Sequence, residues 1–351
     1  MDAKIKYSIL VPAYNVGNYI NECIQSVLES IKDYAAAEIV IIDDGSTDKT
    51  KDVCLEIASK DPRIRFKQQE NKGLILTRRN LLRIANGEYI IFLDSDDKWS
   101  KNFFPTIDST IDLYKPDVIM FSYSRFNENG SLLPIKKPLY DVSQMFDMHM
   151  KTEIILKIVS THHDNNIWSK VIKKEIIDVE TDYEPYKNIQ MGEDLLQLMP
   201  VLCNAKNIYF LTDALYEYRQ NLHSMTYSYK PDYLQNFRDV RWNVYRSLKT
   251  LNLSDKDLSA FFLHYINSIL FYLLQSSYYI KNNKVRLELY SEFKSDKLLS
   301  IAQDAIKPVM LSKRLRILLM ITKKQYIYNL AILKVLFGVK TIYLRLRKSK
   351  K

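Results

Sequence analysis

Short apolar runs alternate with helical patterns through the first hundred residues, and this alternation limits the folds open to the chain. Runs rich in Val, Ile and aromatic residues, which are typical of buried strands, occur at residues 6–11, 38–42, 63–68 and 88–93. Helical spacing of apolar side chains occurs between them, at residues 18–28, 50–59 and 77–85. Strands and helices that alternate over short links predict a Rossmann-like α/β fold, with a mixed, mainly parallel sheet flanked by helices.

Polar clusters follow three of the predicted strands. They are Ala13–Asn15, Asp43–Asp48 and Asp94–Asp97. Ligands of open α/β sheets gather at the carboxyl ends of the strands, so one crevice can hold all three clusters. A nucleotide needs three kinds of partner. These are an aromatic ring for its base, a carboxylate for a base N–H or a ribose hydroxyl, and a carboxylate pair for a metal on its diphosphate.

The stretch from Gly87 to Trp99 is an apolar run that ends in three carboxylates. If the backbone stays extended through Asp94 and Asp96, these two side chains share one side and Asp97 turns away. Such a pair repels itself unless a cation lies between, and Mg²⁺ or Mn²⁺ commonly uses one or two carboxylates plus substrate phosphates. We therefore expect a Mn²⁺ or Mg²⁺ site at Asp94 and Asp96, although an isolated Asp-x-Asp is more often a solvated acidic turn.

Motifs of other phosphate and metal sites are missing from the sequence. It contains no Gly-x-x-x-x-Gly-Lys-Ser/Thr loop and no Gly-x-Gly-x-x-Gly turn, and it has only seven glycines. A calcium loop that begins at Asp94 would need glycine where Trp99 stands and glutamate where Pro105 stands. The pair His162-His163 has no third histidine or cysteine at zinc spacing. We therefore do not expect a glycine-rich phosphate loop, a calcium loop or a zinc site.

Four segments, taken together in this order and spacing, resemble the family 2 glycosyltransferases with the GT-A fold, of the bacterial polysaccharide type. The segments are Val11–Asn15, Asp43–Asp48, Asn71–Gly73 with Arg79–Asn80, and Gly87–Asp97. The resemblance implies a nucleotide-sugar donor, usually a UDP-sugar, with its base held by Tyr14 and Asp44. It also implies a metal on Asp94 and Asp96. The full set of implied donor contacts is Pro12, Ala13, Tyr14, Asn15, Asp43, Asp44, Arg79, Asp94 and Ser95.

Glu193 and Asp194 stand at the predicted start of a helix that continues with apolar residues. Acids in a first turn are favoured by the helix dipole, typically by roughly 0.3–1 kcal/mol, so a capping role is the simpler reading. The resemblance adds a second reading, because the pair matches the Glu-Asp motif of the family. It implies that Asp194 is the general base, with Glu193 beside it.

Two later segments also resemble elements of this family. Trp168 and Lys170 belong to a Trp-x-Lys element, and Arg219 and His223 belong to a Tyr-x-Tyr-Arg segment. The resemblance makes these four residues candidates for contacts with the diphosphate or the acceptor. A surface loop is the alternative for Arg219 and His223.

Sugar transfer explains why two separate acid sites are needed. Negative charge grows on the leaving diphosphate, which a metal can stabilise, while the acceptor hydroxyl loses a proton that Asp194 can take. A single displacement inverts the anomeric centre and needs no covalent nucleophile. We expect a hexosyl- or N-acetylhexosaminyl-transferase. The alternatives are a nucleotidyltransferase, which would show a basic glycine-rich loop after the first strand, and a non-catalytic membrane-associated nucleotide-sugar-binding protein.

The pattern predicts a GT-A domain at residues 1–228 and a helical region at residues 229–351. Residues 261–280 form a segment without a formal charge that is long enough to span a bilayer. Its polar residues favour instead a buried helix of a small bundle. Lys323, Lys334 and Arg345 recur every eleven residues, about three helical turns, and form one basic stripe. A helix that lies in the membrane interface fits this stripe better than one that crosses it, and a solvated bundle face is the alternative.

The charge is concentrated at the carboxyl end of the chain. Thirteen lysines and arginines and no acid follow Asp304, so the remaining residues sum to −3 against a total of +10. A basic, apolar tail suits an anionic membrane surface rather than nucleic acid. With three scattered cysteines and no apolar leader at the start, we expect a cytoplasmic protein, peripheral on the inner face of the cell membrane, with a lipid-linked saccharide as acceptor.

Overall fold

The computed structural model describes residues 4–32, 34, 36–133, 137–161, 163–220, 232–280 and 282–306. By backbone contacts the chain divides into two compact units. The first comprises the described residues of Met1–Ile155, His163–Ile189 and Glu193–Tyr227. The second comprises those of Leu156–His162, Gln190–Gly192 and Ser228–Lys351. The predicted boundary at residue 228 lies outside the described residues and stays a prediction.

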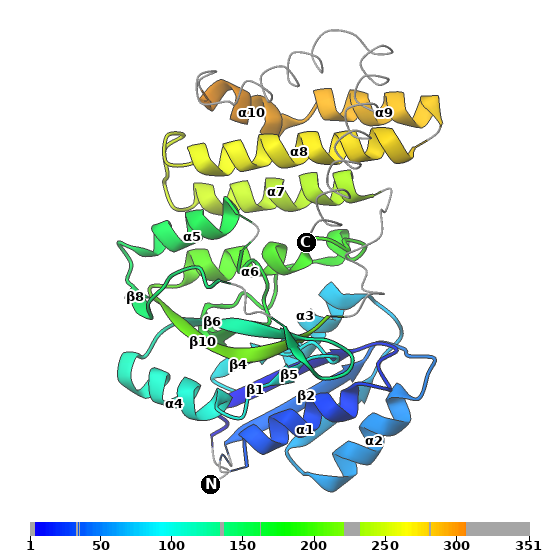
Figure 1. The fold of residues 1–351 in the computed structure, drawn as a ribbon, viewed down its shortest axis with the longest axis vertical. Helices are drawn as coiled ribbons and strands as arrows, with labels where there is room; N and C mark the ends of the chain where they lie inside the picture. Colours follow the sequence, from blue (N-terminus) through cyan, green and yellow to red (C-terminus); the bar gives the residue numbers. More distant parts are fainter. Residues whose placement is uncertain are drawn as a thin grey trace. The chain divides into compact units, whose positions relative to one another are not determined.

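The first unit is built on a mixed sheet of ten described strands (Figure 1). The order across it is β3 (Ile64–Gln68), β2 (Ala37–Asp43), β1 (Tyr7–Ala13), β4 (Tyr89–Phe92), β9 (Lys170–Lys173), β6 (Val118–Phe126), β10 (Ile208–Arg219) and β5 (Lys98–Trp99). Two short strands complete the sheet, β7 (Leu132–Leu133) beside β6 and β8 (Gln144–Phe146) beside β10. Strands β3, β2, β1 and β4 are parallel neighbours, and β9 runs antiparallel between β4 and β6. The predicted fold class is confirmed.

The first three of the six described α-helices of this unit connect the parallel strands β1, β2, β3 and β4, as the alternating pattern predicts. The six are α1 (Ile20–Ser30), α2 (Thr50–Lys60), α3 (Leu74–Ile84), α4 (Phe103–Tyr114), α5 (Lys151–Val159) and α6 (Glu193–Asn204). Helix α3 starts three residues before the expected residue 77, because Gly73 at φ +84° lets the chain turn into the helix there. Strands β1, β2 and β4 are buried along their whole length, which is typical of a sheet covered on both faces.

The sequence pattern predicts a helix over residues 143–159 and another directly after residues 166–170, and both predictions are wrong. The helix expected over residues 143–159 is β8 followed by α5, because β8 pairs with the first residues of β10 and Asp147 then accepts hydrogen bonds from the N–H groups of His149 and Met150. The segment after Trp168 is the strand β9 and not a helix, because it fills the space between β4 and β6. In both cases a partner strand from another part of the chain overrides the local pattern.

The second unit contains α7 (Tyr233–Lys249), α8 (Ser259–Tyr279), α9 (Asn283–Lys294) and α10 (Lys297–Ala305). Helices α7 and α8 lie side by side, and α9 and α10 follow one another along the other side of α8 (Figure 1). Asp296 caps α10 through Leu299 N and also accepts from Arg238 and Tyr265, so one buried carboxylate joins three helices. Among the described residues no helix has the length and apolar character needed to cross a membrane. The basic stripe of residues 323–345 lies outside the described part of the chain, and its membrane contact stays a prediction.

Gly87 leads into β4 at a point where the strand lies against β1. A Cβ atom there would clash with the main-chain nitrogen of Ser8 and come within 2.7 Å of the carbonyl carbon of Tyr7. Since overpacking a tight site costs about 1–3 kcal/mol, we expect Gly87→Ala to lower the melting temperature by roughly 3–10 °C. Thermal unfolding followed by circular dichroism measures this. The exposed Ser109→Ala on α4 is the control, and equal melting temperatures for the two variants would refute the packing argument.

Candidate active site

Residues 94–97, here called the acid turn, leave the sheet directly after β4. Asp97 N donates a hydrogen bond to Asp94 O at 3.0 Å, so the backbone turns here and does not continue extended as the conditional expectation assumed. The turn leaves the carboxylates of Asp94 and Asp96 partly exposed and directs Asp97 into the protein, where it is 1% exposed. Asp94 and Asp96 are therefore accessible to solvent, whereas Asp97 is buried and contacts the protein interior.

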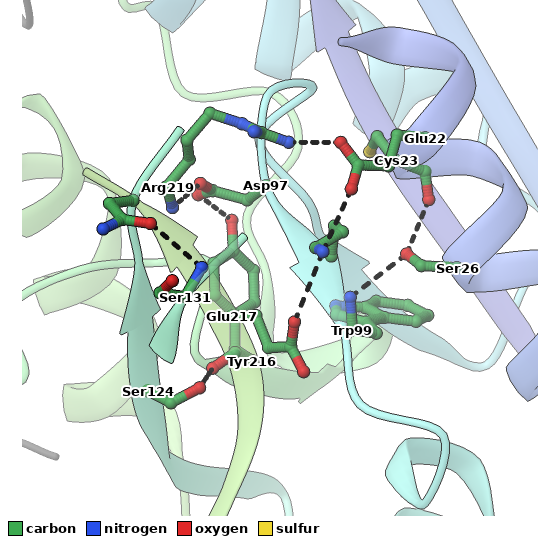
Figure 2. Close-up of polar contacts among 12 residues, drawn as sticks. Glu22, Cys23, Ser26, Asp97, Trp99, Ser124, Ser131, Tyr216, Glu217 and Arg219 are labelled. Carbon is green, nitrogen blue, oxygen red and sulfur yellow. Dashed lines mark hydrogen bonds and ion pairs between the residues drawn. The ribbon is translucent and has the colours of Figure 1, made fainter. Parts of the chain in front are cut away.

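The Asp97 carboxylate joins the acid turn to β10. Its Oδ2 accepts from Tyr216 Oη at 2.6 Å and its Oδ1 accepts from Arg219 N at 2.7 Å (Figure 2). Burial raises the pKa of Asp97 well above its usual range, while the two hydrogen bonds lower it. Because a buried carboxylate is costly unless it is hydrogen-bonded, these contacts hold the acid turn against β10.

Arg219, a predicted diphosphate or acceptor contact, is buried beneath the acid turn. Its Nη2 donates to Glu22 on α1 at 2.6 Å (Figure 2). Its Nε donates to Asp96 O at 2.7 Å. Lys98 lies 3.0 Å from the same glutamate and 3.7 Å from Glu217. Burial raises the pKa of Asp96, and the Arg219 guanidinium opposes that rise. The predicted ligand contact of Arg219 stays a prediction.

Helix α1 contacts the backbone just after the acid turn. Ser26 Oγ accepts from Trp99 N at 3.1 Å and donates to Cys23 O at 2.7 Å (Figure 2). The Trp99 ring stacks on Phe103 of α4 with 3.8 Å between centroids, which makes it a core residue. Trp99, two residues after the acid turn, is thus held by α1 and α4, while Asp97 within the turn is held by β10.

Arg78, which the sequence analysis missed, lies between the two predicted acid sites. Its Nη2 is 3.0 Å from Asp94 Oδ1 and its Nη1 is 2.5 Å from Asp194 Oδ1. The side chain is 1% exposed on α3, beside the buried Ile75 and Leu82. The sequence contains a signal for this buried arginine. Residues 75, 78 and 82 have the spacing of the core-facing side of a helix, where a charged side chain needs partners.

Glu193 and Asp194 form the first turn of α6, as predicted. Burial and the neighbouring Asp194 raise the pKa of Glu193 to about 7, which the Arg78 guanidinium opposes. Burial likewise raises the pKa of Asp94 to about 6, although the ion pair with Arg78 lowers it. The structure therefore brings Asp94, Asp194 and Glu193 into one electrostatic group.

The other strand-end clusters lie beside the acid turn. Strand β1 pairs with both β2 and β4, with Ala13 opposite Asp43, so all three clusters share the carboxyl edge of the sheet. Asp44 accepts from Lys72 N, Gly73 N and Gln69 Nε2 and thereby holds the loop before α3.

The remaining predicted donor contacts surround this edge. Asn15 Oδ1 accepts from Thr47 N and joins the β1 and β2 loops, while the Tyr14 side chain is 49% exposed. Pro12 and Ala13 are buried at the end of β1, Ser95 is buried in the acid turn, and Asp43 accepts from Ser46 N and Gln68 Nε2. No ligand contact is tested for any of these residues, and their roles stay predictions.

Three further candidates are held by neighbouring protein groups. Arg79 donates to Asp178 O at 2.5 Å and lies over the Tyr183 ring at 4.9 Å, on a different side from Arg78. The Lys170 ammonium is fully buried and donates to Asp164 O, Asn166 Oδ1 and Ser169 Oγ. Trp168 stacks on Tyr216 with 4.3 Å between centroids. His223 lies outside the described residues.

The residues at the acid turn fit a hard divalent cation. Among the described residues, the Asp96 carboxylate has no ion-pair partner, and no cluster of three or more His, Cys, Asp and Glu side chains could hold a metal by itself. Burial raises the pKa values of Asp94 and Asp96, so a cation placed between them would stabilise their ionised forms. Two carboxylates plus phosphate oxygens and water are a usual ligand set for Mg²⁺ or Mn²⁺.

Comparison with known proteins identifies the family. Residues 8–174 match the family model described as "Glycosyl transferase family 2". The family predicted from the motifs is confirmed, and this part of the chain is a family 2 glycosyltransferase domain. The match includes the strand-end clusters, Arg78 and the acid turn, and it ends before α6.

Curated relatives are about a quarter identical to the chain over the residues that align. "Glycosyltransferase GlyA" of Streptococcus pneumoniae serotype 4 is 28% identical over 221 residues, which cover 61% of the chain but only 30% of GlyA. "Uncharacterized glycosyltransferase EpsJ" of Bacillus subtilis is 26% identical over 72% of the chain and 74% of EpsJ. "Putative teichuronic acid biosynthesis glycosyltransferase TuaG" of the same organism is 27% identical over 70% of the chain and 89% of TuaG.

Among solved structures, residues 1–349 of S. aureus TarS in complex with UDP superpose with a TM-score of 0.65 and 20% identity. The superposition covers 95% of this chain and 92% of the TarS chain. A second structure of TarS 1–349, in complex with UDP-GlcNAc, gives a TM-score of 0.57. At this identity the likeness shows the fold alone.

The hydrogen bond from the Tyr216 hydroxyl to Asp97 joins β10 to the acid turn, and a single substitution removes it. Tyr216→Phe leaves a buried Asp97 oxygen without its donor, so we expect a loss of about 1–3 kcal/mol in stability. Urea denaturation of the purified protein measures this loss. Tyr245→Phe on α7 is the control, since that hydroxyl has no hydrogen bond to another described residue, and we expect a change within about 0.5 kcal/mol. Equal stability of both variants would contradict the proposed link.

Proposed function

We propose that the protein is an inverting, metal-dependent glycosyltransferase that moves a sugar from a UDP-sugar to a hydroxyl group of a saccharide acceptor. The observation that carries this proposal is the meeting of Asp94 and Asp194 at one buried arginine, Arg78. Leaving-group stabilisation and proton removal must occur within one substrate's length of each other. The ion pairs place the residues suited to these two tasks in a single group.

Each side chain has a defined task in this reaction. Asp94 and Asp96 would hold the metal, which supplies charge stabilisation for the leaving diphosphate when it is bound. Asp194 accepts the proton of the acceptor hydroxyl, for which it must come within hydrogen-bond reach. The hydroxyl oxygen forms the new bond to the anomeric carbon while the bond to the diphosphate breaks. This single displacement gives inversion.

The donor assignment draws on the structural neighbours. TarS of the same fold has been crystallised with UDP and with UDP-GlcNAc, which supports a uridine nucleotide and either a hexosyl or an N-acetylhexosaminyl group here. The exposed Tyr14 and the Asp44 loop lie at the strand ends where a base would be held.

The acceptor assignment draws on the names of relatives and on charge. TuaG is named for teichuronic acid biosynthesis, which supports a role in assembly of a cell-surface polysaccharide. The thirteen basic residues after Asp304 support a peripheral position on the cytoplasmic face of the membrane, beside a lipid-linked acceptor.

Nucleotide binding tests the donor class. We expect UDP with Mn²⁺ to raise the melting temperature by several degrees, because a ligand at about 100 times its dissociation constant adds roughly 2.7 kcal/mol of stability. GDP and CMP with Mn²⁺ serve as matched controls and should shift it less. Stabilisation by GDP alone would overturn the donor assignment.

Substitution of single acids tests the two tasks separately. Asp194→Asn should lower the turnover number by about 10²–10⁴-fold, the usual contribution of a general base, and leave binding of UDP itself intact. Asp96→Asn should abolish the part of UDP stabilisation that depends on Mn²⁺. Transfer from UDP-[¹⁴C]sugars to a saccharide acceptor, or hydrolysis of the donor, measures turnover. Full activity of either variant would remove that residue from the mechanism.

A further inference from the structure

We infer that Arg78 is a positioning residue that couples metal binding at Asp94 to the charge and position of the Asp194 carboxylate. The inference rests on the proposed function, because it assigns Asp94 to the metal and Asp194 to the acceptor proton. It adds a residue that no motif identifies and a thermodynamic link between the two halves of the site.

The burial of Arg78 makes its two partners obligatory. The side chain is 1% exposed, its Nε has no hydrogen-bond partner among the described residues, and the guanidinium lies 5.8 Å from the Phe92 ring centroid. A buried guanidinium remains charged, so it needs carboxylates close by. The Asp94 and Asp194 carboxylates supply that charge and hold the pKa of Arg78 above its ordinary value against the effect of burial.

The guanidinium fork divides its contacts between the two acids. One terminal nitrogen contacts Asp194 on α6 and the other contacts Asp94 at the end of β4, with Arg78 itself on α3. Three elements of the first unit therefore meet at one cation. A change in the charge around either carboxylate alters how strongly the arginine interacts with the other.

A divalent cation on Asp94 would compete with Arg78 for the charge of that carboxylate. The guanidinium would then interact more strongly with Asp194 and hold its carboxylate in a fixed position. Linkage makes the effect reciprocal, so neutralising Asp194 must strengthen the Arg78–Asp94 pair and weaken metal binding. Donor and metal would thus prepare the base before the acceptor reacts.

Arg79 provides an internal contrast. It is the next residue on α3 and is also buried, yet its guanidinium donates to Asp178 O and lies over Tyr183. The coupling is therefore a property of the position of Arg78 and not of any buried arginine on this helix.

A double-mutant cycle on Mn²⁺ affinity tests the coupling. The wild type, Arg78→Gln, Asp194→Asn and the double variant are titrated with Mn²⁺, with and without UDP, and free Mn²⁺ is followed by electron paramagnetic resonance. We expect Arg78→Gln to bind Mn²⁺ at least about threefold more tightly, because a competing cation is removed. Asp194→Asn should weaken binding by roughly 3–10-fold when Arg78 is present and by less than about twofold in the Arg78→Gln background.

The direction of these changes separates coupling from mere structural support. A structural role would make Arg78→Gln bind Mn²⁺ no more tightly than the wild type, and Arg78→Lys should restore part of the wild-type behaviour because it keeps the charge without the fork. Arg63→Gln, which removes an arginine paired with Asp61 near the start of β3, is the matched control and should leave Mn²⁺ affinity unchanged. Melting curves confirm that each variant is folded.

The outcomes also separate this inference from the proposed function. Equal effects of Asp194→Asn in the two backgrounds would refute the coupling and leave the metal site standing. Failure of the folded wild type to bind Mn²⁺ with or without UDP would refute the metal site itself, and the coupling with it.

Discussion

The buried carboxylate of Asp97 is the interaction on which the geometry of the site depends. A carboxylate with 1% exposure needs hydrogen-bond donors, and here they come from Tyr216 and Arg219, about 120 residues further along the chain. The end of β4 is thereby tied to the end of β10. Arg219 then turns back to the carbonyl of Asp96 and to Glu22, so the acid turn is held on both sides. Asp94 and Asp96 owe their outward position to a third acid that faces inwards.

Two buried arginines interact with different acids of the site. Arg219 lies beneath the acid turn and opposes the rise in the pKa of Asp96 that burial causes. Arg78 lies between Asp94 and Asp194 and joins the acid turn to the first turn of α6. An active site that must stabilise a leaving diphosphate and take up a proton benefits from carboxylates whose positions are set before substrate arrives.

Much of this site follows from local sequence patterns. Apolar runs predict β1, β2, β3 and β4, and the polar clusters after three of them mark the ligand edge of the sheet, since side chains at parallel strand ends must come together. Partners distant in sequence are harder to predict. Local patterns assign no role to Asp97, because its partners lie on β10. The motif includes Arg79 but not Arg78, because a motif does not say which side of α3 faces the acids. The segment 143–159 reads as helix until β10 pairs with its first residues.

The sequence by itself determined the family, the order of strands and helices through the first hundred residues, and the acids available for a metal and a base. These features depend on neighbouring residues and on the periodicity of apolar side chains. Tertiary structure alone decided that Asp94 and Asp194 share one guanidinium, that Asp97 and Trp99 are structural, and that Lys170 is buried among oxygen atoms. Each of these outcomes depends on how a side chain is desolvated, and desolvation is set by elements that meet only when the chain is folded.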